Sequence, residues 1–286
     1  MLNIQRDQSY LVLPAFVSIL LIGVVPIFFE IYISLHRYAL GFPWTMRIFQ
    51  GIKNYLDILS SSSFYNSLIL TIIFTLTVTF ISLVLGLAMA IVINRDFKCK
   101  VVIVISILIP QAISTSILGL VWKLMYNSGY GIINYFLKPF GLEQVWLGNQ
   151  LAFTSVIITS VWMASSFMTL VSLAGLQNLP VDVYEAAKID GANSYKVFWH
   201  ITLPLLKPVL GMAVLLQQVA CFHTFGIIYI LTGGGPGEKT NLLALEIYQK
   251  GINSGFVGYA AGIATILAVL ALVLSFVFLK ILGKEF

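Results

Sequence analysis

Apolar residues along this chain gather into long runs, and polar residues are mostly confined to the segments between them. A helix that crosses a lipid bilayer needs about 20 predominantly apolar residues. Six runs meet this length, and they are approximately Tyr10–Leu35, Ser67–Ile93, Val101–Tyr126, Leu151–Leu176, Pro208–Leu231 and Val257–Leu282. Prolines inside the runs, such as Pro110, are tolerated where neighbouring helices satisfy the freed carbonyls. The pattern predicts an all-α integral membrane protein with six transmembrane helices.

The composition agrees with a membrane location. The 286 residues are 59% hydrophobic and 9% charged, whereas soluble domains carry about 25% charged residues. The net charge of +5 does not indicate nucleic-acid binding, because the basic residues form no patch or basic helix face. The two cysteines, Cys99 and Cys221, lie in different segments, which excludes a disulfide framework. The three histidines are scattered and no HExxH, CxxC or GxSxG motif occurs, so a metal site or a covalent-catalysis site has no support, and we predict a non-catalytic chain that binds no cofactor of its own.

Lysine and arginine between the runs indicate how the helices are oriented. With the amino terminus in the cytoplasm, the short inner segments carry nine of these residues and the longer outer segments carry seven. The loop NRDFKCK, residues 94–100, gives the strongest bias. The first run is too long for a signal peptide and has no small-residue cleavage site after it, which favours a retained helix. We therefore predict that both termini are cytoplasmic.

The outer segments and the last run carry further local signals. Aromatic, helix-like stretches such as NYLDILSSSSFYNSL and NLLALEIYQKGIN predict ordered caps rather than linkers. Gly258 and Gly262 have the GxxxG spacing, which is typical of closely packed membrane helices.

A polar segment between the fourth and fifth runs differs from the sequence around it. Its charged residues include Glu185, Lys188, Asp190 and Lys196. Pro180 suits the first turn of a helix that continues through YEAAK, a strong helix-forming stretch. Gly191 suits the turn that ends this helix, and Asn193 or Ser194 can cap a second one. We predict a helix–turn–helix at the cytoplasmic surface, with Pro204 marking the return to the membrane.

Two interpretations of this polar segment fit its residues. One is an amphipathic helix pair that rests on lipid headgroups, although lipid insertion favours large apolar side chains on one face. The other is docking into the groove of a protein partner. Ala186, Ala187 and Gly191 make a smooth surface, and Glu185 and Asp190 flank it. The residues alone leave both interpretations open.

The same segment resembles a known signature. The order Glu185-Ala186-Ala187, Gly191, Ile201, Leu203-Pro204 is similar to the signature loop of the permeases of binding-protein-dependent ABC importers. The stretches LTGGGPGEKTNLLALEIY, FVGYAAGIATIL and LPAFVSILLIGVVPIFFEIYISL resemble the carbohydrate subfamily, on the side of its maltose permease F and glycerol-phosphate permease A. The resemblance covers essentially the whole chain.

The resemblance implies a type I ABC importer permease fold in a bacterial or archaeal inner membrane. It divides the chain into a first transmembrane helix with its outer loop, residues 1–65, and a permease core, residues 66–286, with a coupling loop at 178–204. The implied partners are a second permease, two cytoplasmic ATPase subunits that hold ATP and Mg²⁺, and an extracytoplasmic sugar-binding protein. The coupling residues would be Tyr184, Glu185, Ala186, Ala187, Asp190 and Gly191.

Neutral polar residues in two runs are candidates for the path of the solute. In the fourth run, polar and aromatic residues recur at helical spacing, among them Trp162, Ser165 and Ser166. In the fifth run, Gln217, Cys221 and Thr224 share one helix face, and Gln218 flanks it. The resemblance implies sugar contacts at Gln217, Cys221, Thr224, Ala164 and Phe167. The maltose-type relatives carry amides where this chain has Cys221 and Thr224, so the resemblance does not identify the solute.

Neutral donors and acceptors beside aromatic rings suit a sugar, but other interpretations remain. Serine and threonine in membrane helices often bond only to their own backbone or to a neighbouring helix. A secondary carrier is disfavoured because ionisable groups inside the membrane are few, namely Glu30, Lys123 and His223, and no series of carboxylates for ion coupling occurs. There are two further alternatives. One is an ABC permease for glycerol phosphate or an amino acid, and the other is an intramembrane enzyme.

Overall fold

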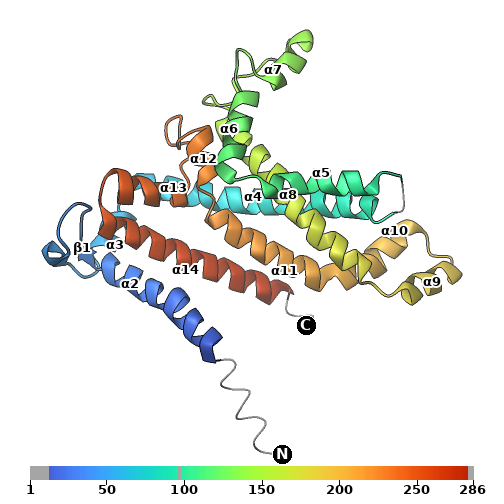
Figure 1. Cartoon of the computed structure of the whole chain (residues 1–286), viewed down its shortest axis with the longest axis horizontal. Coiled ribbons are helices and arrows are strands. Elements are labelled where there is room, and N and C mark those ends of the chain that lie inside the picture. Colours follow the sequence, from blue (N-terminus) through green and yellow to red (C-terminus); the bar gives the residue numbers. More distant parts are fainter. Residues whose placement is uncertain (1–12, 96–97, 283–286) are drawn as a thin grey trace, which may run out of the picture. The chain divides into compact units, whose positions relative to one another are not determined.

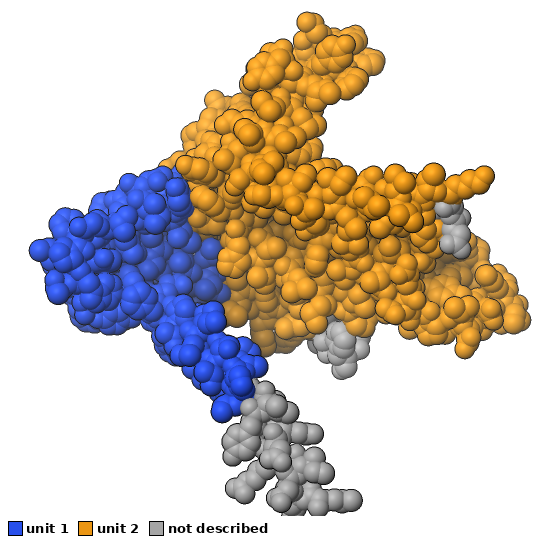
Figure 2. Space-filling view, viewed as in Figure 1, with its two compact units in different colours: residues 1–65, 246–269 blue, residues 66–245, 270–286 orange. Residues whose placement is uncertain are grey.

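The computed structural model describes residues 13–95 and 98–282. The predicted start of the first span at Tyr10, and the basic residues Arg6 and Lys284, lie outside these residues. The chain divides into two compact units, which Figure 2 colours separately. Unit 1 comprises Met1–Tyr65 and Glu246–Val269, and unit 2 comprises Asn66–Leu245 and Leu270–Phe286.

Long apolar helices form the framework of the described chain (Figure 1). Five of them are long and apolar enough to cross a membrane, namely Leu13–Ser34, Ser62–Ile93, Ala152–Gln177, Ser194–Phe222 and Val257–Lys280. The first contains a π-helical turn, η1 (Leu20–Val24), followed by α2 (Val25–Ser34), and the others contain α4 (Ser62–Ile93), α8 (Ala152–Gln177), α11 (Leu203–Phe222) and α14 (Val257–Leu282). The predicted all-α membrane fold is confirmed.

The third predicted span is present as a bent pair of helices and not as one straight helix. It consists of α5 (Lys100–Ala112) and α6 (Thr115–Met125), which are bent by 104° relative to each other. Ile113 and Ser114 have extended backbone, with ψ of 135° and 137°. Pro110 lies in the last turn of α5, and because proline lacks an N–H the helix is weakened just before this break.

The fifth predicted span is displaced at both ends. Its helix begins well upstream, because α10 (Ser194–Val197), the π-helical η4 (Phe198–Thr202) and α11 are continuous. Pro204 therefore does not begin a helix, but stands inside this one, just after the π-helical turn. α11 then ends at Phe222, and a separate helix, α12 (Gly226–Leu231), follows. A short break at residues 223–225 thus interrupts the second half of the predicted span.

The two broken spans pack against each other inside unit 2. A Cβ added to Gly226 of α12 would lie 2.8 Å from Thr115 Oγ1, at the start of α6. A Cβ added to Gly119 of α6 would lie 3.1 Å from Ile230 Cβ in α12. Glycine at both positions therefore allows the close approach of α6 and α12.

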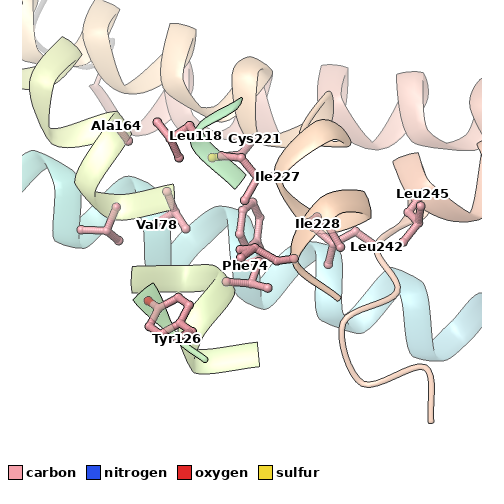
Figure 3. Close-up of a cluster of buried hydrophobic side chains, with 13 residues drawn as sticks. Phe74, Val78, Leu118, Tyr126, Ala164, Cys221, Ile227, Ile228, Leu242 and Leu245 are labelled. Atoms are coloured by element: carbon pink, nitrogen blue, oxygen red, sulfur yellow. The ribbon is translucent and has the colours of Figure 1, made fainter. Parts of the chain in front are cut away.

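The largest buried cluster of unit 2 draws side chains from several helices. Its members include Phe74 and Val78 of α4, Ala164 of α8, Cys221 of α11 and Ile228 of α12, and Figure 3 shows them converging. The cluster also holds Leu242 and Leu245 from the start of α13 (Leu243–Tyr248). This core fixes α8 and α11 beside α4, which places the predicted solute-path residues.

Unit 1 joins the first helix to the beginning of α14 through an ordered outer cap. The cap contains β1 (His36–Arg37) paired antiparallel with β2 (Ile48–Phe49), the 3₁₀ turn η2 (Trp44–Met46), α3 (Lys53–Leu59) and the π turn η5 (Gln249–Asn253). A Cβ on Gly262 would lie 2.8 Å from Ile58 Cδ1, and one on Gly258 would overlap the carbonyl oxygen of His36. Close packing at both glycines is confirmed, but their partners are β1 and α3 of the cap and not a second membrane-spanning helix.

The outer segment of unit 2 between α6 and α8 is also ordered. It forms α7 (Ile132–Leu137) and the 3₁₀ turn η3 (Lys138–Phe140). Asn134 organises it, because its amide oxygen accepts from the Gln144 N–H at 3.1 Å and from Trp146 Nε1 at 2.9 Å. The prediction of ordered caps is confirmed.

Candidate functional site

The polar segment after α8 folds as two helices joined by a glycine turn. α9 (Val181–Ile189) begins after Pro180, whose backbone is extended. At its end Gly191 has φ +71°, and Ala192 N–H donates to Ala187 O at 2.9 Å, the pattern that typically ends helices at a glycine. The side chain of Asn193 then caps α10 by accepting from Lys196 N–H at 2.9 Å. The predicted helix–turn–helix and its cap are confirmed.

The predicted coupling residues divide between an outer and an inner face. Glu185, Ala186, Asp190 and Gly191 are exposed. Ala187 is buried, and the Tyr184 hydroxyl is 3.0 Å from Thr202 Oγ1 in η4. Tyr184 and Ala187 therefore hold α9 against its own chain, and only the other four face outward.

Two exposed apolar side chains on α9 were missed by the sequence analysis. Ile189 is 86% exposed and Val181 is 66% exposed. Val181, Glu185 and Ile189 follow one another at intervals of four residues, so they line one face of the helix. This four-residue spacing is visible in the sequence and could have identified the exposed face of α9. The exposed face of α9 thus presents the carboxylate of Glu185 between the apolar side chains of Val181 and Ile189. This combination suits contact with another protein.

A cavity of about 560 Å³ lies between α4, α5, α6 and α8. Its lining comprises Ile81, Leu85, Met89, Ser106, Ile107, Pro110, Trp122, Ile157, Ile158, Val161, Trp162, Ser165 and Ser166. Three predicted path residues, Trp162, Ser165 and Ser166, belong to it. Trp122, which was not predicted, meets Trp162 edge-to-face with ring centroids 5.7 Å apart.

The hydroxyl groups around this cavity are partly used by their own helices. Ser165 Oγ donates to Val161 O at 2.7 Å, and Ser106 Oγ donates to Val102 O at 2.9 Å. Backbone bonding, the alternative weighed from the sequence, therefore applies to Ser165. The cavity is mainly apolar, and its two tryptophans are its largest recognition surfaces.

The predicted residues of α11 lie elsewhere, in the buried cluster. Gln217 and Cys221 are both buried, and Gln217 Nε2 is 3.5 Å from Cys221 Sγ. Ala164 of α8 belongs to the same cluster as Cys221. Thr224 lies past the end of α11, where its hydroxyl donates to Ala220 O at 3.1 Å. It therefore does not extend the helical face of Gln217 and Cys221.

Phe167 and Gln218 occupy two further places. Phe167 packs with Met168, Ala213 and Val214 in a separate apolar cluster. Gln218 is buried, and its Oε1 has no hydrogen-bond partner among the described residues. The predicted path residues thus form no single pocket in this conformation. Those of α8 divide between the cavity and two apolar clusters, Gln217, Gln218 and Cys221 are buried on α11, and Thr224 lies beyond that helix.

Comparison with known proteins identifies similar sequences along most of the chain. The family described as "binding-protein-dependent transport system inner membrane component" matches residues 82–283. The trehalose/maltose transport system permease protein MalF of Thermococcus litoralis is 40% identical over 95% of this chain and 92% of its own length. The sulfoquinovosyl glycerol transport system permease protein SmoG of Agrobacterium fabrum is 34% identical over 96% and 90%.

Solved structures share the fold at lower identity. A bacterial alginate ABC transporter, in complex with an alginate-bound periplasmic protein, has a chain that matches with a TM-score of 0.82 and 19% identity. The match covers 96% of this chain and 94% of that chain. A second crystal structure of a bacterial ABC transporter for alginate import matches with a TM-score of 0.79 and 22% identity, over 99% and 97%.

Proposed function

We infer the function of this chain from its family: it belongs to the binding-protein-dependent transport system inner membrane components. The chain is a non-catalytic permease subunit of an ABC importer in the inner membrane. We propose that its solute is a neutral sugar or oligosaccharide, delivered by a binding protein on the outer side. ATP and Mg²⁺ are bound by a partner ATPase and not by this chain.

The proposed assembly contains a second permease, two ATPase subunits and the binding protein. The exposed face of α9 docks in a cleft of one ATPase, with Glu185 as the charged contact and Val181 and Ile189 as apolar contacts. This assignment puts α9 and both termini in the cytoplasm. It is supported by the exposure of Glu185 and by the fixed turn at Gly191.

The observation that carries the mechanism is the continuous helix Ser194–Phe222. A rise of 1.5 Å per residue makes it about 43 Å long, so displacement of its cytoplasmic end moves its whole length. The Tyr184–Thr202 hydrogen bond ties α9 to this helix. Movement of the docked α9 on ATP binding would therefore shift α11, and with it Gln217 and Cys221, relative to α4 and α8. Alternating access follows from that relative movement.

A neutral sugar fits the membrane helices better than an anionic solute. α4 and α8 contain no charged residue, and α11 has only Lys207 near its beginning. A phosphate or carboxylate in the path would have no cation to pair with along these helices, at a considerable cost in a low-dielectric setting. Trp122 and Trp162 offer flat rings for the apolar face of a sugar. Glycerol phosphate or an amino acid remains the second candidate.

The test is uptake by the reconstituted transporter in proteoliposomes. We expect uptake to require ATP hydrolysis and the binding protein, and to be insensitive to collapse of ion gradients. Glu185→Lys should abolish uptake and the ATPase stimulation by the sugar-loaded binding protein. Lys188→Ala, an exposed change on the same helix, is the matched control. Uptake driven by an ion gradient without ATP would identify a secondary carrier and refute the proposal.

A further inference from the structure

One face of α4 carries a row of hydroxyl groups that face the protein interior. The row consists of Ser67, Thr71, Thr75, Thr79 and Ser82, and each is at most 5% exposed. Hydroxyls in membrane helices usually bond to a carbonyl of the preceding turn. Thr71 donates to Ser67 O at 2.6 Å and Ser82 donates to Thr79 O at 3.1 Å. Ser67, Thr75 and Thr79 differ, because their hydroxyl oxygens have no hydrogen-bond partner among the described residues.

Thr79 is distinguished from Ser67 and Thr75 by what lies beside it. Its neighbour in α4, Val78, packs in the same buried cluster as Cys221 of α11, and the Thr79 hydroxyl is near enough to the Cys221 thiol to interact with it weakly. That thiol is in turn 3.5 Å from Gln217 Nε2. A thiol is only a weak hydrogen-bond partner. A hydroxyl, a thiol and an amide from two helices therefore meet without strong bonds between them.

The surroundings of this group are apolar. Figure 3 shows Cys221 within the cluster that contains Phe74, Val78 and Ala164. Thr79 is 5% exposed, Cys221 2% and Gln217 8%. Water is thus excluded from three polar side chains that have poor partners in the protein. Such groups are unfavourable as packing alone, and they suit a state in which another molecule supplies the missing bonds.

We propose that Thr79 is a solute-binding residue, which joins Gln217 and Cys221 in a site for the hydroxyl groups of a neutral polyhydroxy solute between α4 and α11. The site is closed in this conformation and opens when α11 moves away from α4. A threonine hydroxyl both donates and accepts, and the glutamine amide does both through separate atoms. These groups can bridge adjacent sugar hydroxyls without a charge. The proposal rests on the sugar-importer function proposed above.

The chain offers a native reporter for the opening of this site. It contains two cysteines, of which Cys99 is exposed and Cys221 is buried. In a Cys99→Ser transporter, N-ethylmaleimide can report on Cys221 alone, provided that the partner subunits carry no reactive thiol. We expect slow labelling at rest, faster labelling during ATP turnover, and protection when the transported sugar is present. That sugar is first chosen from trehalose, maltose and longer glucans by ATP-dependent uptake.

Substitutions at Thr79 test its own contribution. Thr79→Val removes the hydroxyl at nearly constant volume, and loss of one neutral hydrogen bond predicts an uptake rate about three- to tenfold lower. Binding-protein-stimulated ATP hydrolysis should persist, because the α9 contact is unchanged. Thr79→Ser should restore uptake. Thr75→Val is the matched control, one turn away with an equally buried hydroxyl, and it should transport normally.

The outcomes separate this proposal from the function on which it rests. Normal uptake and normal sugar selectivity in Thr79→Val would overturn the proposal, as would a Cys221 that stays unlabelled in every state of an active transporter. If Thr79→Val fails to assemble, the Thr79→Ser variant and the labelling experiment still decide. Absence of ATP-dependent uptake in the unmodified transporter refutes the importer function instead.

Discussion

Gly86 of α4 is the position where an added methyl group should disturb the helix packing most directly. A Cβ built there would overlap Met168 Cβ, and would lie 2.8 Å from both Met168 C and Thr169 N in α8. Carbon atoms in contact are ordinarily about 3.5–4.0 Å apart. Gly86→Ala therefore requires α4 and α8 to separate by about 1 Å at this crossing.

The cost of this separation follows from the atoms involved. Two of the three nearest atoms are backbone, which cannot rotate away as a flexible side chain can. Overpacking in a well-packed core typically costs about 1–3 kcal/mol, and the better helix propensity of alanine offsets up to about 1 kcal/mol. We expect a net destabilisation of about 1–2 kcal/mol, which corresponds to a fall in Tm of roughly 2–8 °C.

Thermal unfolding of the purified permease in detergent measures this effect. Gly23→Ala is the control, because nothing lies within 4 Å of a Cβ at that position, and its Tm should not fall. A Gly86→Ala protein that melts at or above the wild-type temperature, with the Gly23→Ala control unchanged, would show that α4 and α8 do not cross as closely as described.

Three further predictions concern the α9 segment and the segment between α6 and α8. Gly191→Ala should reduce coupling between ATP hydrolysis and uptake, because φ +71° costs a non-glycine residue about 1–2 kcal/mol although nothing obstructs the methyl group; normal coupling would count against a fixed turn. Tyr184→Phe, which removes the hydrogen bond to Thr202, should lower the amount of solute taken up per ATP hydrolysed, although the ATPase still binds. An unchanged ratio of uptake to ATP hydrolysis would show that this hydrogen bond does not transmit movement from α9 to α11. Asn134→Ala leaves the Gln144 N–H and Trp146 Nε1 without their acceptor, so limited proteolysis should cut the outer segment sooner, and an unaltered cleavage rate would contradict that role.

Hydropathy predicted the existence of the spans well, because lipid imposes a simple requirement on length and apolar character. It could not predict where a span breaks. The bend at Ile113–Ser114 and the early end of α11 depend on the pairing of α6 with α12 through Gly119 and Gly226. Those are contacts between segments far apart in the sequence, and the apolar pattern is the same on both sides of each break.

The candidate site shows the same division between features that local sequence predicts and features that depend on long-range packing. The helix, glycine turn and cap of the α9 segment are local, so residues such as Gly191 and Asn193 could be identified from sequence rules. Which α9 side chains face outward depends on packing against η4, and this explains why Tyr184 turned inward while Ile189 was missed. The hydroxyl row of α4 went unnoticed because serine and threonine at helical spacing usually bond to their own backbone, and only the position of Cys221 distinguishes Thr79.

The continuous helix from Ser194 to Phe222 has a consequence for the tolerated length of the chain. A single residue inserted into an α-helix rotates everything after it by about 100°, whereas a π-helical turn such as η4, with its i→i+5 bonds, holds more residues in one turn than an α-helix does. The angular position of Gln217 relative to α9 is therefore set by the number of residues in Phe198–Thr202, as well as by their identity. Inserting one further residue there would preserve both the docking face and the solute-facing side chains, yet would aim them in different directions. In this segment, residue count is itself a functional property of the sequence.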